Sequence, residues 1–455
     1  MKRSLVAVLG GLLFPFMMKA QDDSVMIRQI VEDVLIRGEA YENLRFICKK
    51  IGPRLSGSPQ GAKAVTETAR MMREMGADTV YLQECMVPKW VRKGRDTASL
   101  IMANGKGQPL RITALGNSEG TSASGIKASV IEVRDFDELE RMKDQVKGKI
   151  VFYNHPMNPR YIETFRAYGA AGQYRGQGAS RAAKYGAVGV IIRSLASNPD
   201  DYPHTGAMRY DTAFAKIPAV AISTNDADLL SSALMKKMVS QVYIKAECGM
   251  QGEVLSHNVV GEIRGSEFPD EIITVGGHID SWDLAEGAHD DGAGCVQSIE
   301  IIRVMKALGI KPKRTIRAVM FMNEENGLRG GTKYAELAKA ENKKFIFALE
   351  SDAGGFVPRG FGFTAKPEQI TKIFAWKPLF QPYGADNFNV GGGGADIGPL
   401  RPLGTVMAGL NPDSQRYFDV HHASSDVFEA VSPRELNLGA VAMAGLVYMV
   451  SQYGL

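Results

Sequence analysis

The sequence predicts an α/β fold in which a mainly parallel sheet is flanked by helices and the chain is interrupted by an inserted domain. Strand and helix patterns alternate from about residue 256 onward, and such alternation is typical of parallel sheets covered by helices. Residues 115–247 show a different pattern of short predicted strands and helices, and they contain none of the histidine and carboxylate motifs that follow them. At 455 residues the chain is long enough for two or three domains and a large core.

The composition is that of a globular protein without a strongly charged partner. Aliphatic and aromatic residues make up 45% of the chain and charged residues 23%. The 54 basic and 50 acidic residues nearly balance, and three of the basic ones, Lys2, Arg3 and Lys19, lie in the first twenty positions. We therefore expect neither nucleic acid nor an anionic membrane as a partner.

The N-terminus predicts an export signal over residues 1–20. Lys2 and Arg3 precede the apolar run 5–18, and Ala20 stands before the polar Gln21. That run is shorter than the roughly 20 residues that span a bilayer, so we expect cleavage after Ala20 and a periplasmic or extracellular protein without a membrane span. The alternative is a buried N-terminal helix.

The first half of the chain predicts helices, one strand and then the inserted domain. Residues 26–76 carry a helical pattern that is broken at 52–53 and 57–59, and 79–82 resemble a strand. We assign 21–114 to the first part of a catalytic domain, 115–247 to the insertion and 248–455 to the second part. Within the insertion we expect strands at 148–152, 186–192 and 217–222 and a helix at 180–185.

The second half predicts that several polar side chains meet at one edge of the sheet. Strands are expected at 272–275, 316–322 and 345–349, with helices at 294–308 and 328–340. His278, the pair Glu324 and Glu325, and Asp352 each follow one of these strands. Ligands of open α/β sheets gather beyond the carboxyl ends of the strands, so we expect these side chains to converge.

The converging residues include a ligand set for two zinc ions. His278 offers a ring nitrogen, and Asp280 can hold the other ring nitrogen as an outer partner. Asp290 lies in a glycine-rich loop and could give one oxygen to each ion, whereas its neighbour Asp291 suits the cap of the next helix. Histidine combined with carboxylate suits zinc, although cobalt or manganese could occupy such a site in vitro.

The remaining roles fall to the glutamate pair, Asp352 and a histidine pair. Glu325 and Asp352 supply carboxylate oxygens, and His421 or His422 supplies the second ring nitrogen. We expect Glu324 not to bind metal. A carboxylate beside the metal ions can take a proton from an activated water molecule and pass it to a leaving amine.

With these motifs in hand, the chain resembles the co-catalytic zinc exopeptidases that include bacterial aminopeptidases and glutamate carboxypeptidase. The motifs that carry the resemblance lie at 52–58, 256–262, 276–283, 290–292, 312–317, 324–325, 350–354 and 421–422. The resemblance implies a phosphorylase/hydrolase-like catalytic domain, an inserted protease-associated domain, a cis peptide bond after Asp290 and a homodimer.

The same resemblance implies the roles of individual residues. Its His-x-x-x-Asp spacing to Asp426 selects His422 over His421. Zinc is then bound by His278, Asp290, Glu325, Asp352 and His422, and Glu324 is the base.

We expect a di-zinc exopeptidase that hydrolyses short peptides or dipeptides with free termini. Two alternatives remain: an inactive binding protein of the same fold, or a single-zinc glutaminyl cyclase. The preference among aminopeptidase, dipeptidase and carboxypeptidase activity stays open. So does disulfide pairing among the scattered cysteines, which are Cys48, Cys85, Cys248 and Cys295.

Overall fold

A computed structural model describes residues 14–103 and 105–455. Residues 1–13 of the expected export signal lie outside the described residues, and positions 14–20 begin helix α1 (Phe14–Arg37). The export signal therefore stays a prediction.

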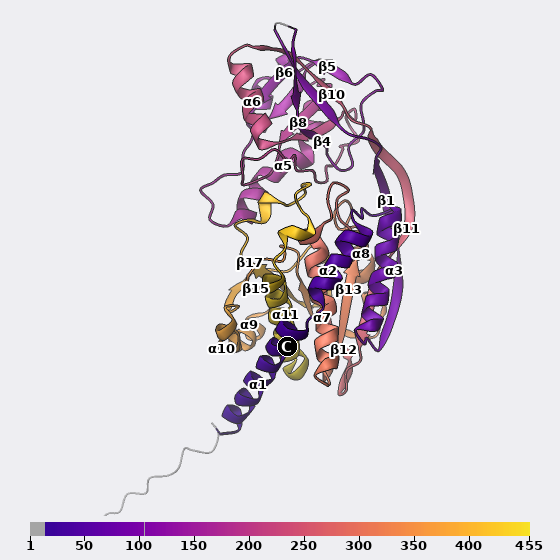
Figure 1. Cartoon of the computed structure of the whole chain (residues 1–455), viewed down its shortest axis with the longest axis vertical. Coiled ribbons are helices and arrows are strands. Elements are labelled where there is room, and N and C mark those ends of the chain that lie inside the picture. Colours follow the sequence, from indigo (N-terminus) through magenta and orange to yellow (C-terminus); the bar gives the residue numbers. More distant parts are fainter. Residues whose placement is uncertain (1–13, 104) are drawn as a thin grey trace, which may run out of the picture.

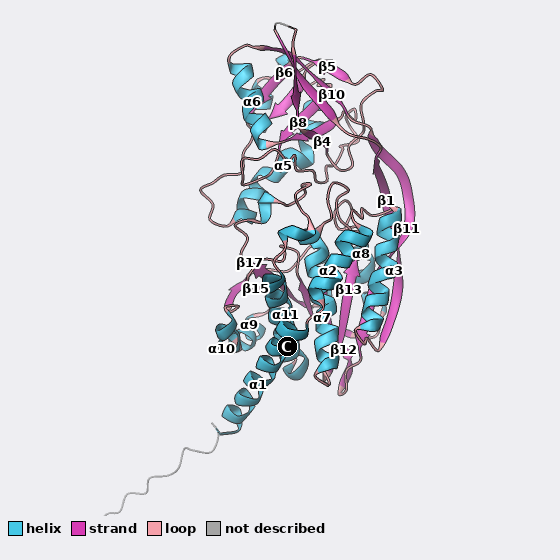
Figure 2. Ribbon diagram, viewed as in Figure 1, coloured by secondary structure: helices cyan, strands magenta, loops and turns pink. Residues whose placement is uncertain are grey.

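The larger body of the molecule is built on an eight-stranded mixed sheet (Figure 2). Its strand order is β1-β11-β13-β12-β14-β17-β15-β16. The central strands β13, β12, β14 and β17 run parallel, while β1 and β11 are antiparallel at one edge and β15 is antiparallel to β17. The strands are β1 (Thr79–Arg92), β11 (Cys248–Ile263), β12 (Phe268–His278), β13 (Arg314–Phe321), β14 (Lys344–Glu350), β15 (Pro358–Thr364), β16 (Asn387–Val390) and β17 (Val406–Pro412).

Helices cover both faces of this sheet, which confirms the predicted α/β class. Strand β13 is buried at every position and divides its side chains between the two faces. Ile316, Ala318 and Met320 pack in the core under α1, α2, α3, α7 and α11, whereas Val319 and Phe321 pack with α8. These helices are α2 (Ala40–Phe46), α3 (Pro59–Glu74), α7 (Ala293–Ala307), α8 (Arg329–Ala340) and α11 (Pro433–Tyr453), and the shorter α9 (Pro367–Phe374) and α10 (Lys377–Phe380) lie near β15 and β16.

Helix α11 is long and apolar enough to cross a bilayer, but it is a core helix of this fold. Most of its apolar window, 78%, is buried inside the molecule. It contacts α1 and α7 and packs over the sheet, so its hydrophobicity is explained by burial within the protein.

The inserted domain forms a second body joined to the first by the long ribbon of β1 and β11 (Figure 1). It contains a five-stranded sheet of order β4-β9-β8-β7-β6 and a four-stranded sheet of order β3-β2-β10-β5. The strands are β2 (Thr97–Met102), β3 (Gly107–Leu110), β4 (Ile112–Ala114), β5 (Ile126–Ala128), β6 (Val130–Val133), β7 (Ile150–Tyr153), β8 (Gly189–Arg193), β9 (Ala219–Ile222) and β10 (Val239–Lys245), and the helices are α4 (Phe136–Arg141), α5 (Thr164–Ala183) and α6 (Thr224–Met235). The strands of both smaller sheets thus lie between Thr97 and Lys245, while the boundaries at 115 and 247 remain a prediction.

All four cysteines, Cys48, Cys85, Cys248 and Cys295, are free thiols in the structure.

Candidate metal centre

The structure brings all five predicted ligands to one edge of the large sheet. His278 ends β12, while Glu325 and Asp352 lie just beyond the ends of β13 and β14. Asp290 lies in the segment Ala288–Gly292 just before α7, where its own backbone is not helical, and His422 lies in the loop between β17 and α11. The convergence follows from parallel neighbouring strands whose carboxyl ends share one edge.

These residues form two groups that share one carboxylate. The Nε2 atom of His278 is 3.2 Å from Oδ1 of Asp290 and 3.3 Å from Oδ1 of Asp352. The Nε2 atom of His422 is 3.3 Å from Oδ2 of Asp290 and 3.2 Å from Oε2 of Glu325. Each group therefore combines one ring nitrogen, one separate carboxylate and one oxygen of Asp290.

The geometry distinguishes His422 from its neighbour. His421 also approaches Oδ2 of Asp290, at 3.7 Å, but only His422 reaches Glu325 as well. The His421 ring stacks on His422 with centroids 3.6 Å apart and packs against Tyr417. His422 has φ +62°, a left-handed backbone conformation that non-glycine residues rarely adopt and that is often found at functional sites.

The donor set fits cations held by nitrogen and oxygen. Asp290 is buried, and its Oδ2 atom receives no well-directed hydrogen bond from the described residues. Burial opposes ionisation of this carboxyl, yet the neighbouring His278 and His422 hold its pKa well below the usual range. An ionised carboxylate that lies between two imidazoles and has one oxygen without a hydrogen bond is a group that a bound metal ion would complete, and imidazole with carboxylate suits zinc.

Glu324 lies beside the centre without joining either ligand group. Burial, followed by the charges of Asp352 and Glu325, raises its pKa well above the usual range, while the nearby His278 lowers it. Glu324 also lines a cavity of about 730 Å³ that opens onto Asp290, Glu325, Asp352 and His422. The side chain is therefore available to a molecule bound in that cavity.

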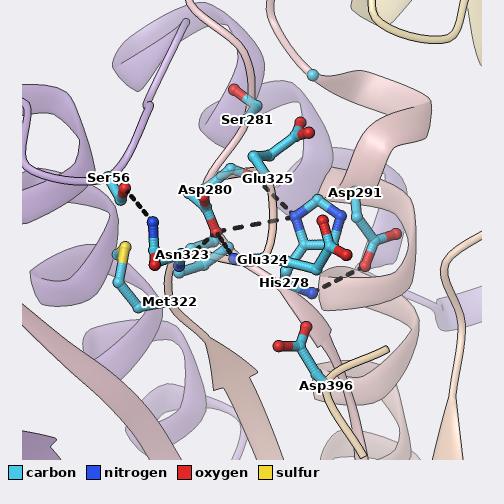
Figure 3. Close-up of polar contacts among 12 residues, drawn as sticks. Ser56, His278, Asp280, Ser281, Asp291, Met322, Asn323, Glu324, Glu325 and Asp396 are labelled. Carbon is cyan, nitrogen blue, oxygen red and sulfur yellow. Dashed lines mark hydrogen bonds and ion pairs between the residues drawn. The ribbon is translucent and has the colours of Figure 1, made fainter. Parts of the chain in front are cut away.

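Asp280 contacts both His278 and the turn that carries Glu324 (Figure 3). Its main-chain carbonyl is 3.0 Å from Nδ1 of His278, whereas its carboxylate is 3.9 Å away. The carboxylate instead accepts hydrogen bonds from the backbone N–H groups of Asn323, at 2.7 Å, and Glu324, at 3.1 Å. The predicted contact with the histidine is thus made by the carbonyl, and the carboxylate fixes the position of the Glu324 backbone.

Arg54 supports the loop that joins His278 to Asp290, and sequence reasoning did not find this role. The side chain is fully buried. It donates to the carbonyl oxygens of Ile279, at 2.5 Å, Glu286, at 2.5 Å, and Gly287, at 2.9 Å. Arg54 falls inside the motif 52–58, but nothing in its sequence neighbourhood indicates partners more than 200 positions away.

Two further buried carboxylates lie behind the ligands. Asp426 accepts from the backbone N–H groups of His289, at 2.8 Å, and Asp290, at 3.1 Å, and burial raises its pKa to about 7. Asp396, which lies near His278 in Figure 3, has both oxygens buried without a hydrogen-bond partner among the described residues. The His-x-x-x-Asp spacing pointed to Asp426, whereas no sequence signal singled out Asp396.

The peptide bond between Asp290 and Asp291 is cis, as the resemblance implied.

The inserted domain reaches the centre directly. The backbone N–H of Thr205 donates to the carbonyl of His422 at 3.0 Å, and the Thr205 carbonyl is 3.3 Å from Nδ1 of the same histidine. Nδ1 of His204 is 2.6 Å from the carbonyl of His421. The candidate ligand His422 is therefore held by the inserted domain at both its backbone and its ring.

Comparisons with known proteins give consistent results over most of the chain. Residues 258–447 match Peptidase family M28, and residues 101–230 match the PA domain. Carboxypeptidase Q of Mus musculus is 36% identical over 417 residues, which are 91% of this chain and 86% of that protein. Carboxypeptidase Q of Homo sapiens is 35% identical over 415 residues, with the same two shares.

Solved structures agree with the sequence comparison. A peptidase M28 precursor from Shewanella amazonensis has a TM-score of 0.90 and 32% identity, and the match covers 95% of this chain and 97% of that one. A zinc aminopeptidase from Bacillus subtilis has a TM-score of 0.66 at 21% identity, covering 90% of this chain and 94% of that one, which shows a shared fold.

Proposed function

This chain belongs to peptidase family M28 and is a zinc metallopeptidase, and on that premise we propose that it is an exported exopeptidase that hydrolyses short peptides or dipeptides with free termini. Family membership confirms the resemblance to zinc exopeptidases, and the chain is also similar to plasma glutamate carboxypeptidase, also called carboxypeptidase Q. Export is supported by the order of charges and apolar residues in positions 1–20.

The proposal assigns two zinc ions to each chain. His278 and Asp352 would hold one ion, His422 and Glu325 the other, and Asp290 would be shared. The observation that carries this assignment is the position of Asp290, whose two oxygens face the two different histidines at 3.2 and 3.3 Å. One carboxylate that serves two groups is the arrangement expected of a two-metal site.

Each protein group then has a separate task. When bound, the zinc ions supply Lewis-acid chemistry by polarising the scissile carbonyl and acidifying a water molecule. Glu324 accepts the proton of the attacking water and returns it to the nitrogen of the leaving amine, so that the carboxylate is regenerated. Asp280 keeps the Glu324 backbone in place, and the cavity walls keep the peptide beside that carboxylate.

The test combines metal analysis with a panel of dipeptides. Purified protein should contain two zinc ions per chain and should hydrolyse free dipeptides faster than amino-blocked or carboxy-blocked ones. One zinc per chain would instead support a glutaminyl cyclase, and metal without hydrolysis would support a binding protein. A mature N-terminus at Gln21 in secreted material would support export, whereas a retained N-terminus would contradict it.

A further inference from the structure

Trp282 belongs to the larger body of the molecule, but its side chain packs in the core of the inserted domain. It lies in the loop between β12 and α7, shortly after His278, and only 3% of its surface is exposed. Its indole belongs to the same buried apolar cluster as Val220 and Ile222 of β9. This side chain therefore crosses the boundary between the two bodies of the molecule.

Gly116 of the inserted domain leaves room for the end of the indole. A Cβ atom at this position would lie 1.8 Å from Cη2 and 2.3 Å from Cζ3 of Trp282. Gly116 does not have a positive φ, so its lack of a side chain, rather than its backbone freedom, is what this contact requires. Two backbone hydrogen bonds of 3.0 Å fix Gly116, one to the carbonyl of Gly206 and one from the N–H of Met208. The indole thus ends against backbone that is itself held in place.

Packing alone holds the indole of Trp282. The ring of Trp90 meets it edge to face with centroids 6.3 Å apart, and Trp90 is fixed in turn by a hydrogen bond from its Nε1 to the carbonyl of Ser118 at 2.8 Å. The Nε1 atom of Trp282 has no hydrogen-bond partner among the described residues. Because shape and burial fix this side chain, its position should depend on the size of the residues around it.

Trp282 contacts two of the predicted zinc ligands. Its backbone N–H donates to Oε1 of Glu325 at 3.2 Å, while Oε2 of the same carboxylate faces Nε2 of His422, also at 3.2 Å. The indole packs edge to face against the ring of His422 with centroids 5.8 Å apart. Trp282 therefore restrains the carboxylate oxygen that faces away from His422, and it supports the histidine ring from the side.

The other group of ligands lacks these contacts. We call His422, Glu325 and Asp290 the His422 site, and His278, Asp352 and Asp290 the His278 site. Within residues 14–103 and 105–455, Trp282 makes no hydrogen bond or ring contact with His278 or Asp352. The support that it gives is thus confined to one of the two candidate ion sites.

We propose that Trp282 is a positioning residue for the His422 site: by packing into the inserted domain at Gly116, it holds Glu325 and His422 in the geometry that binds one zinc ion. This inference rests on the proposed two-zinc centre and makes the affinity of one ion depend on the inserted domain. Residues that orient metal ligands from behind raise metal affinity by about 10- to 100-fold. The ion of the His278 site should not depend on Trp282 in this way.

The test measures the affinities of the two zinc ions by titration with a chelator, with bound zinc counted by native mass spectrometry. Trp282→Phe keeps the backbone N–H but removes the ring atoms that reach Gly116. It should weaken binding of one ion at least about tenfold and leave the other unchanged. Trp376→Phe is a matched control, because Trp376 is also buried and packs against Tyr453 of α11, and it should change neither affinity.

His422→Ala identifies the affected ion. This variant should lack the ion of the His422 site, and adding Trp282→Phe should leave the affinity for the remaining ion unchanged. Further weakening of that ion would overturn the proposal by making Trp282 a general structural residue. Equal weakening of both ions by Trp282→Phe alone, or no weakening of either, would overturn it too.

Gly116→Ala tests the same contact from the inserted domain. Its methyl group would collide with the indole, so this variant should weaken the same ion without changing any residue of the larger body. Phenylalanine lacks the ring atoms that meet this methyl group. The loss of affinity in the variant that combines Gly116→Ala with Trp282→Phe should therefore be smaller than the product of the two separate losses.

Independent effects of these two substitutions would refute the role of the contact. A native protein that binds fewer than two zinc ions would instead contradict the proposed two-zinc centre, so the two failures can be told apart.

Discussion

Replacement of Arg54 by lysine tests whether this buried side chain supports the loop between the two halves of the metal centre. The arginine donates from three different nitrogens to three carbonyls, at Ile279, Glu286 and Gly287. A lysine carries its three N–H donors on a single nitrogen and cannot reach carbonyls that Nε, Nη1 and Nη2 contact from different sides of the guanidinium, so we expect it to replace one of the three contacts. The other two carbonyls would remain buried without their donors.

The expected size of the effect follows from those two carbonyls. A buried polar group without its partner costs about 1–3 kcal/mol, so the free energy of unfolding should fall by about 2–6 kcal/mol. This is a large share of the roughly 5–15 kcal/mol that stabilises a typical domain. Because the loop connects His278 to Asp290, zinc affinity should fall as well.

Urea unfolding of the zinc-free protein, with zinc affinity measured by competition with a chelator, checks both effects. Arg45→Lys is a suitable control, because Arg45 is exposed, its ion pair is with Glu42 on the same helix, and a lysine can also make its cation–π contacts with Tyr41 and Phe428. It should leave stability and zinc affinity unchanged. If Arg54→Lys matched the native protein in both measurements, the supporting role of the three hydrogen bonds would be refuted.

Three other predictions concern the base, the histidine pair and a buried acid far from the site. Glu324→Gln should lower kcat by at least about 100-fold while both zinc ions stay bound, and near-normal kcat would contradict its role as the base. His422→Ala should lower the zinc content by about one ion per chain, whereas His421→Ala should retain both ions; the reverse result would exchange their roles. Burial raises the pKa of Glu300 to about 7, so the folded protein keeps this proton at pH values where the unfolded chain has lost it, and stability from this group falls as the pH rises from about 4.5 to about 7. Glu300→Gln should therefore gain stability relative to the native protein as the pH rises from 5 to 8, measured by thermal unfolding. If the stability difference between the two proteins stayed the same over these pH values, Glu300 would not titrate in this range.

The sequence predicted the central elements well because their signals are local. The apolar run 316–322 coincides with β13, and the carboxylates after it lie at the end of that strand. Helix α5 was predicted only near its end, since glycines at 169, 172, 176 and 178 weaken the helical signal along its length. Strand β1 continues well past residue 82, because it forms a ribbon with β11 that tolerates polar side chains on its exposed face.

Contacts between distant parts of the chain could not be predicted in the same way. The packing of Arg54 against the 279–287 loop depends on how the first helices meet the sheet, which no periodic pattern encodes. The position of Thr205 beside the centre depends on how the inserted domain docks. Burial of Asp396 likewise follows from the path of a glycine-rich loop, so its composition alone gave no indication of the carboxylate that it buries.

The two hydrogen bonds between Thr205 and His422, one donated by the Thr205 N–H and one accepted by the Thr205 carbonyl, link the two bodies of the molecule thermodynamically. An ion that requires His422 in this orientation favours the docked position of the inserted domain. Because such coupling is reciprocal, undocking of the inserted domain lowers the affinity for that ion by the same factor as the ion favours docking. Removal of the metal would then favour separation of the two bodies. A chelator should therefore increase the movement of the inserted domain about the β1 and β11 ribbon.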